Sequence, residues 1–458
     1  MKAYDLKPTY ENLLETYRKD TIDRNIDIFR FVSILDSIDD ACAIAVDGNW
    51  GSGKTFFVKQ VKMVMDAHNE FVCSETDDNR SEIMSIRERY LGKNLVPLQP
   101  QICVYYDSWE NDNDSDPVMS LVYTILNSVD SDFSLKDTNF LEIGASIIEL
   151  FSGKDWMKVI EKLRGSSPLD VIRENKDIKK LVDDFLDALL PEKGERLVIF
   201  IDELDRCKPS YAVRLLERIK HYFDHDRITF VFSVNTNELH HTVKKHYGND
   251  FDGSRYLDRF FDLRISLPPP NLEKFYQSLN FNNTNYIYDF VCDAVIKTYH
   301  FELREIAKFL RLTKIAAYNA THGNHEAYFP NERALQFCML YILPVMIGLR
   351  VSDTEKYSNF INGKDHSSLV EIAENAKPLH IFNSLLNDQE SYDKKETQKE
   401  YVTVPGKLKA VYEAIFTVNY DGLTYHTIIG KMEFSAKTKR TLLQTAGLLS
   451  PHMNTNII

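Results

Sequence analysis

The sequence is short of glycine, of paired cysteines and of long apolar runs, and the last two shortages each exclude a class of protein. Its six cysteines are scattered singly along 458 residues, which is typical of reduced thiols rather than of a disulfide framework. The most apolar run, residues 337–349, contains a proline and is shorter than the roughly 18–20 residues that cross a bilayer. We therefore expect a cytoplasmic protein without a membrane span.

Basic charge is also in short supply. The chain has 55 Lys and Arg residues against 68 Asp and Glu residues, so its formal net charge is -13. An acidic surface of this size opposes general binding to a phosphate backbone, so nucleic acid is not indicated as a partner. The length predicts two to three domains, each with room for a buried core.

Glycine is rare, with 17 in the whole chain, yet three of them fall within one short stretch, DGNWGSGKT. The spacing is G-x-x-x-x-G-K-T, between an apolar run and a helix-like segment, which is typical of a phosphate-binding loop. Backbone N–H groups of such a loop and the N-terminus of the following helix bind phosphate oxygens. Lys54 is expected to reach the β- and γ-phosphates and Thr55 to bind Mg²⁺. The predicted nucleotide-binding residues of the loop are Gly48, Asn49, Trp50, Gly51, Ser52, Gly53, Lys54, Thr55 and Phe56.

A phosphate-binding loop also needs an acidic motif beside it to bind the magnesium ion, and the run RLVIFIDELD contains one. Its apolar residues end at Asp202, which we predict to be a further magnesium ligand, in the manner of the Walker B acid. Glu203 follows directly and is the candidate base that deprotonates an attacking water. The alternative is an acidic strand end that caps the next helix.

Apolar strand patterns alternate with helical patterns over the first 270 residues. We expect strands near residues 42–46, 102–106, 197–201, 228–235 and 261–267. This alternation predicts an α/β fold with a parallel sheet flanked by helices. Three prolines at 268–270 end the pattern, and helices follow.

The domain organisation follows from these changes in pattern. We predict a nucleotide-binding domain, a helical lid or subdomain, a polar linker, and a small C-terminal module that is a candidate site for a partner protein. Their ranges are 1–270 (with an insertion around 69–195), 271–385, 386–400 and 401–458.

The order of the motifs resembles that of KAP family P-loop NTPases. The segments DGNWGSGKT, VYYDSWEND, IDELDRC and YLDRFFDLRISLPPP occur in the family's order, within about residues 20–315. The resemblance implies ATP hydrolysis with Mg²⁺ on an additional-strand P-loop core. It assigns Lys54 and Thr55 to the phosphates and metal, and Asp202 to the metal. Phage-exclusion proteins belong to that family, which suggests a setting in bacterial anti-phage defence.

The sequence departs from the family pattern in two respects. Many members carry membrane-spanning segments inserted in the P-loop domain, whereas the corresponding stretch here is too short and contains glutamates. Membrane attachment is therefore not carried over. Arg259 stands where the family usually has lysine, in the run before the fifth strand.

Four further polar residues are candidates for the site. Asn235, at the end of the fourth strand, either lies near the attacking water or caps a helix. Arg255 and Arg259 are expected to share a helix face. In one hypothesis, one of these arginines contacts the γ-phosphate bound by a neighbouring subunit, which predicts a homo-oligomer. In the alternative, both arginines form surface salt bridges. Arg304 is a candidate to close over nucleotide bound by its own chain.

The favoured hypothesis is an ATPase that acts as an oligomeric switch or assembly ATPase. One alternative is a nucleotide-dependent scaffold with little turnover, and another is a small-molecule phosphotransferase whose acceptor binds the helical insertion. Replacement of Glu203 by Gln discriminates the first two, because it traps ATP only in a protein that hydrolyses it.

Overall fold

The computed structural model describes residues 6–70, 76–92, 96–114, 116–129, 143–148, 178–279, 286–322, 329–375, 404–418 and 426–447. The chain divides into two compact units. One comprises Lys7–Asn271 and is called here the phosphate-loop unit. The other comprises Leu272–Ile458 with Met1–Leu6 and is called the helical unit.

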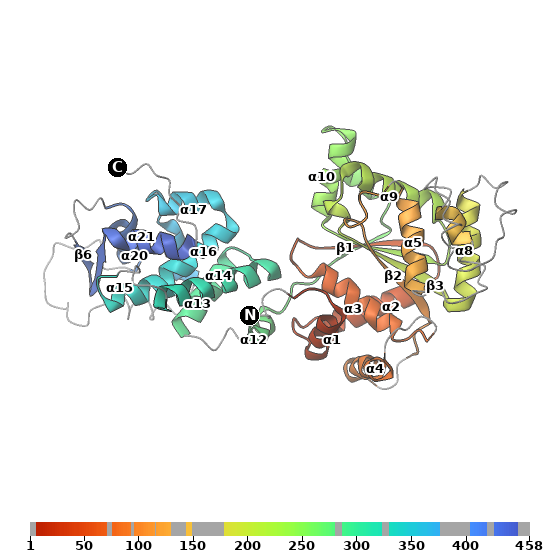
Figure 1. Cartoon of the computed structure of the whole chain (residues 1–458), viewed down its shortest axis with the longest axis horizontal. Coiled ribbons are helices and arrows are strands. Elements are labelled where there is room, and N and C mark those ends of the chain that lie inside the picture. The colour runs from red at the N-terminus through yellow and green to blue at the C-terminus, as the bar shows by residue number, and fades with distance from the viewer. Residues whose placement is uncertain are drawn as a thin grey trace. The chain divides into compact units, whose positions relative to one another are not determined.

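A five-stranded parallel sheet forms the centre of the phosphate-loop unit (Figure 1). Its order is β2-β3-β4-β1-β5. The strands are β1 (Cys42–Asp47), β2 (Gln101–Asp107), β3 (Arg196–Asp202), β4 (Ile228–Val234) and β5 (Leu263–Ser266). Every residue of β3 and β4 is buried, because helices cover both faces of the sheet. The predicted fold class is confirmed.

Helices cover each face of the sheet with a separate apolar core. Alternate residues of β3 point to opposite faces, so that Val198 and Phe200 join one core while Leu197, Ile199 and Ile201 join the other. The first core contains α1 (Tyr10–Lys19), α2 (Asn25–Asp36), α3 (Lys54–Asp66) and α4 (Asp77–Leu91). The second contains α5 (Pro117–Val129), α8 (Ile178–Lys193), α9 (Pro209–Tyr222) and α10 (Thr236–Tyr247).

The register of the strands brings acidic residues to one edge of the sheet. Asp107 at the end of β2 pairs with Asp202 at the end of β3. On the other side, Asp47 at the end of β1 lies beside Val234 of β4. Because all these strands are parallel, their carboxyl ends and the loops after them share this edge, where ligands bind in open α/β sheets.

Part of the predicted insertion is a regular helix. Residues 77–91 form α4, and Thr76 caps its N-terminus, since the Thr76 hydroxyl accepts a hydrogen bond from the Asn79 N–H. Its buried side chains include Ile83 and Ile86, which join the core on the α3 face of the sheet. Ile83 and Ile86 lie in a highly charged segment, so the apolar periodicity is too weak to reveal the helix.

The helical unit consists of helices and one hairpin in its described residues. It contains α12 (Leu272–Ser278), α13 (Tyr286–Thr298), α14 (Leu303–His322), α15 (Glu332–Phe337), a π-helical turn (Cys338–Ile342), α16 (Leu343–Ser352), α17 (Thr354–Ile361), α18 (Ser367–Asn375), α20 (Val404–Phe416), β6 (His426–Ile429), β7 (Met432–Ser435) and α21 (Ala436–Gly447). α20 packs against α18, and α21 packs against α14 and α16. The described part of the predicted C-terminal module therefore belongs to the same compact unit as the helices before it, whereas the predicted linker at 386–400 lies outside the described residues.

One continuous helical stretch in the described residues, Glu332–Ser352, is long and apolar enough to cross a membrane. Of its apolar window, 72% is buried inside the protein, as in the core helix of a globular unit. Its length and composition are therefore explained by packing against the helices around it, and the stretch gives only weak evidence for a membrane span.

Candidate functional site

The loop between β1 and α3 has the backbone shape that the glycine spacing predicts. Gly51 and Gly53 have φ of 87° and 93°, in the region that side chains with a Cβ rarely adopt. Gly48 has no room for a side chain, because an added Cβ would lie 2.9 Å from the Ser52 hydroxyl. The loop therefore curls over the N-terminus of α3, as an anion cradle requires.

Two polar side chains of this loop are directed inward. The Lys54 ammonium, only 8% of whose residue surface is exposed, donates to the carbonyls of Gly48 (2.6 Å) and Asn49 (3.1 Å). The Ser52 hydroxyl is buried and has no hydrogen-bond partner in the described structure. Both side chains fit a bound phosphate group, because phosphate oxygens can accept hydrogen bonds from the Lys54 ammonium and from the Ser52 hydroxyl.

The acidic motif after β3 lies within electrostatic range of Lys54. Burial lowers the pKa of Lys54, and the carboxylates of Asp205, Asp202, Glu203 and Asp47 oppose that shift. The phosphate loop and the acidic turn, about 150 residues apart in the chain, therefore lie next to each other, and the Trp50–Asp205 hydrogen bond joins them directly. The structure brings together the lysine and acids that the sequence assigned to the site.

Asp202 is almost wholly buried at the end of β3. Its carboxylate accepts hydrogen bonds from the Tyr105 hydroxyl (2.9 Å) and from the Glu203 N–H (3.0 Å). The Lys59 ammonium, on α3, lies 4.1 Å from the centre of the Tyr105 ring. Burial lowers the pKa of Lys59, and the Asp202 charge opposes that shift. These contacts hold a carboxylate beside the phosphate loop, as a magnesium ligand requires. Thr55, the other predicted ligand, is half-buried in the first turn of α3.

Glu203 adopts a left-handed backbone, with φ of 60°, and begins the short 3₁₀ turn Leu204–Arg206. Its carboxylate pairs with the Arg206 guanidinium at 2.6 Å. Burial raises the pKa of Glu203, the neighbouring Asp202 charge adds to the rise, and Arg206 opposes it. A raised pKa suits a group that must take up a proton near neutral pH.

Asp205, whose role the sequence did not reveal, contacts the phosphate loop directly. The Trp50 indole N–H donates to its carboxylate at 2.5 Å, across 155 positions of sequence. Burial raises the pKa of Asp205, and the Trp50 hydrogen bond and Lys54 oppose that rise. No spacing in the sequence could have revealed this contact, because it depends on how the strands are ordered in the sheet.

Arg24 is a second residue that sequence reasoning missed. Its guanidinium is buried (3% exposed) and donates to the Ser52 carbonyl at 2.8 Å and to the Pro268 carbonyl at 2.5 Å. It thereby joins the phosphate loop to the chain that leaves β5. The only signal in the sequence was its position in the segment DTIDRNIDIFRFV, which resembles the family's lead-in.

The other predicted site residues lie in different settings. Asn235 caps α10, since its side-chain oxygen accepts from the N–H groups of Asn237 and Glu238. The helix α11 ends at Leu257 (Gly253–Leu257), so the expectation that Arg255 and Arg259 share a helix face is wrong. The chain turns after this helix, with the Arg259 N–H bonded to the Tyr256 carbonyl.

Both of these arginines are exposed, and the Arg259 carbonyl accepts a hydrogen bond from Lys220. Arg304 is exposed in the first turn of α14 and belongs to the helical unit. Phe56 packs its half-buried ring against the core on the α3 face of the sheet. Its side chain is therefore structural.

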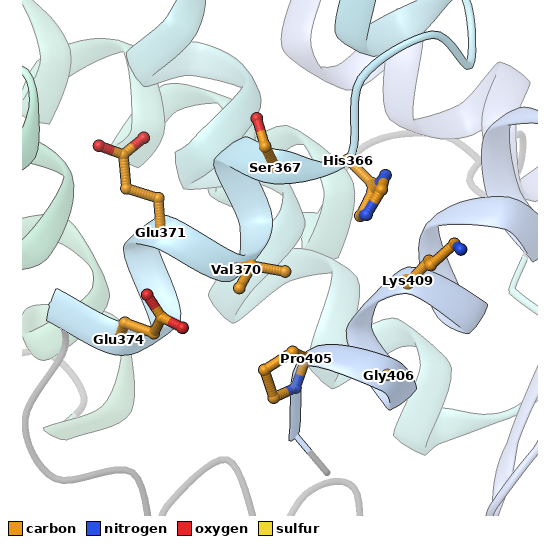
Figure 2. A pocket seen from close by; sticks show the side chains of 8 residues that line it. All are labelled: His366, Ser367, Val370, Glu371, Glu374, Pro405, Gly406 and Lys409. Carbon is orange, nitrogen blue, oxygen red and sulfur yellow. The ribbon is translucent and has the colours of Figure 1, made fainter. Parts of the chain in front are cut away.

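A separate hollow lies in the helical unit, between α18 and the start of α20 (Figure 2). Figure 2 shows acidic side chains on the α18 side and a lysine on the α20 side. It is lined by His366, Ser367, Val370, Glu371, Glu374, Pro405, Gly406 and Lys409. Among the described residues, no group of three or more His, Cys, Asp or Glu side chains is arranged to hold a metal ion, there or elsewhere.

Comparison with known proteins matches most of the phosphate-loop unit to one family. A model of the KAP family P-loop domain matches residues 28–287. A stretch of 75 residues is 31% identical to the phage T7 exclusion protein of Escherichia coli (strain K12), and it covers 16% of this chain and 10% of that protein. The matched part of the chain thus spans about a tenth of the length of that relative. The solved structure of the Aeropyrum pernix ORC2 protein (ADPNP–ADP complexes) aligns over 85% of this chain and 95% of its own, at 13% identity and a TM-score of 0.31.

Proposed function

The chain belongs to the KAP family of P-loop domain proteins, and we propose that it binds ATP with Mg²⁺ and hydrolyses it to ADP and phosphate. The observation that supports this most directly is that the carboxylates of Asp202 and Glu203 lie within electrostatic range of Lys54, at the carboxyl ends of the strands. Phosphoryl transfer needs a phosphate cradle, a metal ligand and a group that activates water, and these residues are of the required types.

Each residue has a defined task in the proposed reaction. The loop N–H groups and Lys54 hold the phosphates, while Thr55 and Asp202 are the ligands offered to Mg²⁺, which neutralises charge on the phosphate oxygens when bound. Glu203 takes a proton from water as the water oxygen bonds to the γ-phosphorus. The bond from that phosphorus to the bridging oxygen breaks, and ADP leaves with the electron pair.

Turnover is proposed to serve an oligomeric switch or assembly ATPase. Arg255 and Arg259 are exposed, so a neighbouring copy has access to them, and either guanidinium would stabilise charge on the γ-phosphate. Arg304, in the helical unit, is proposed to respond to nucleotide bound by its own chain. The local likeness to a phage exclusion protein supports a role in anti-phage defence, with the C-terminal region as a candidate partner-binding segment.

A nucleotide-dependent scaffold with little turnover is the second candidate function. The ion pair between Glu203 and Arg206 favours it, because a paired carboxylate is less free to act as a base. A small-molecule phosphotransferase is a third candidate, with an acceptor site in an insertion that lies largely outside the described residues.

Phosphate release from ATP and Mg²⁺ is the decisive assay, run beside size measurement with and without nucleotide. We expect steady release by the wild type, none by Lys54→Ala, and a bound but uncleaved nucleotide in Glu203→Gln. Lys19→Ala, which removes a lysine that is 62% exposed and paired with Glu15 on α1, is the matched control for loss of a lysine. Binding with no release by the wild type would establish the scaffold instead, and a wild type that stays monomeric with nucleotide would contradict the oligomeric switch.

A further inference from the structure

The turn after β3, Glu203 to Arg206, is stabilised by contacts between these two residues. Arg206 donates its backbone N–H to the Glu203 carbonyl at 3.1 Å, and its side chain pairs with the Glu203 carboxylate at 2.6 Å. Neither side chain is far into solvent, with 23% of Arg206 and 18% of Glu203 exposed. The pair therefore fixes a side chain whose own backbone is in an unfavourable left-handed conformation.

Two tryptophans hold the same guanidinium. The Arg206 guanidinium carbon lies 5.6 Å from the Trp50 ring centre and 5.8 Å from that of Trp109, both within the range of cation–π attraction. Both tryptophans are exposed, Trp50 to 45% and Trp109 to 55%, so neither is a core residue. Their contacts with the Arg206 guanidinium explain why large apolar rings stand at these positions. Arg206 thus bridges the phosphate loop and the loop that follows β2.

Each tryptophan is itself anchored to the acidic edge of the sheet. The Trp50 indole N–H donates to Asp205 at 2.5 Å, and the Trp109 backbone N–H donates to the Asp107 carboxylate at 3.1 Å. Movement of either loop would therefore move Arg206 and, through the ion pair, Glu203. The phosphate loop and the candidate base are mechanically connected.

We propose that Arg206 is a positioning residue that fixes Glu203 for hydrolysis, and that its seat between Trp50 and Trp109 couples this position to the phosphate loop. The inference rests on the proposed ATPase function and adds a determinant of turnover to it. Arginine suits the task because its planar guanidinium pairs with a carboxylate and stacks on aromatic faces at the same time. Lysine supplies the positive charge but has no planar group to stack on the two tryptophan rings.

The opposite role is a latch, in which Arg206 withholds Glu203 until a partner draws the guanidinium away. The two roles predict opposite signs for removal of the side chain. A positioning residue is needed for turnover, whereas a latch limits it. The three contacts that immobilise Arg206 favour positioning, because a latch must be released whenever the enzyme turns over.

The test compares Arg206→Ala and Arg206→Lys with the wild type in phosphate release, over a range of ATP concentrations. Small displacements of catalytic groups cost about 100-fold in rate, so we expect kcat to fall about 10- to 100-fold in Arg206→Ala. KM and the affinity for a fluorescent ATP analogue should stay within about 2-fold. Arg206→Lys should recover little of the loss. Arg30→Ala breaks an exposed ion pair of the same i,i+3 spacing, to Asp27, and should leave kcat unchanged.

Trp109→Ala tests the same idea without touching the acidic turn. It should lower kcat in the same direction, and its effect should be smaller when Arg206 is already lysine, because the two side chains act as one unit. A kcat in Arg206→Ala equal to or above that of the wild type would overturn the proposal, as would a loss that lies wholly in KM. Nucleotide binding without turnover by the wild type would overturn the ATPase and this role together, whereas active wild-type protein with an unaffected Arg206→Ala overturns this role alone.

Discussion

Arg24 is the contact by which the phosphate loop is fastened to the rest of its unit, and its removal should be costly. Hydrogen bonds to charged groups contribute about 1.5–3 kcal/mol each, and Arg24 makes one to the Ser52 carbonyl and one to the Pro268 carbonyl. Burying the guanidinium costs several kcal/mol, which offsets part of this sum. We expect Arg24→Ala to lower the free energy of unfolding by about 2–4 kcal/mol, since it also leaves two carbonyls unsatisfied.

The unfolding of the phosphate-loop unit can be followed selectively within the full chain. All three tryptophans of the chain lie between residues 7 and 271, so tryptophan fluorescence reports the unfolding of that unit. For a unit of this size, a loss of 1 kcal/mol lowers Tm by about 2–4 °C, which gives a fall of about 5–15 °C. Nucleotide affinity should weaken by about 10-fold, because the loop loses its anchor.

Two variants keep this reasoning refutable. Arg24→Lys can reach one carbonyl at a time and should lose roughly half as much stability as Arg24→Ala. Arg30, with 70% of its side chain exposed, is the control, and Arg30→Ala should unfold within about 1 °C of the wild type. If Arg24→Ala melts with Arg30→Ala, the buried guanidinium does not hold the loop, and the argument from its hydrogen bonds is wrong.

Three further expectations follow from the same unit. Gly53→Ala places a Cβ at φ of 93°, so it should cost about 1–2 kcal/mol and weaken ATP binding, and unchanged unfolding in urea would contradict the loop conformation. Burial lowers the pKa of His68 despite its bond to the Val64 carbonyl, so the unfolded chain binds that proton more tightly. Stability should therefore fall as pH drops below about 6.5, and His68→Gln should flatten this fall in urea titrations at pH 7, 6 and 5, whereas an unchanged slope excludes His68 as its source. Arg259→Ala mixed with Lys54→Ala should recover part of the lost phosphate release if Arg259 acts across subunits, and no recovery counts against a donated arginine.

The sequence predicted those parts of the site that depend on local spacing. The glycines of the phosphate loop and the apolar run that ends in Asp202 are contiguous patterns with a direct backbone consequence, and both elements lie where those patterns indicated. The cap at Asn235 was one of two readings of a polar residue after a strand. The structure shows the cap, and a contact with an attacking water stays a prediction.

The parts that the sequence did not predict are contacts between segments far apart in the chain. Trp50 contacts Asp205 because β1 and β3 both pair with β4, and Arg24 contacts both the phosphate loop and Pro268 because β5 pairs with β1. The pattern of apolar residues predicts strands but not the order in which they pair. The helix face assigned to Arg255 and Arg259 failed for a local reason, because α11 ends at Leu257, before the second arginine.

The charges around Lys54 lead to a last prediction about what holds the triphosphate. Three cations (Lys54, Lys59 and Arg206) face five carboxylates (Asp47, Asp107, Asp202, Glu203 and Asp205), so the side chains alone give the site a negative balance. A triphosphate is also negative, and the loop N–H groups with the N-terminus of α3 supply only about half an elementary charge. Divalent cation is therefore expected to contribute most of the affinity, and EDTA should weaken binding of a fluorescent ATP analogue by more than 10-fold. Equal affinity with and without Mg²⁺ would mean that the acidic edge does not face the nucleotide, and that Asp202 is a structural residue of the sheet.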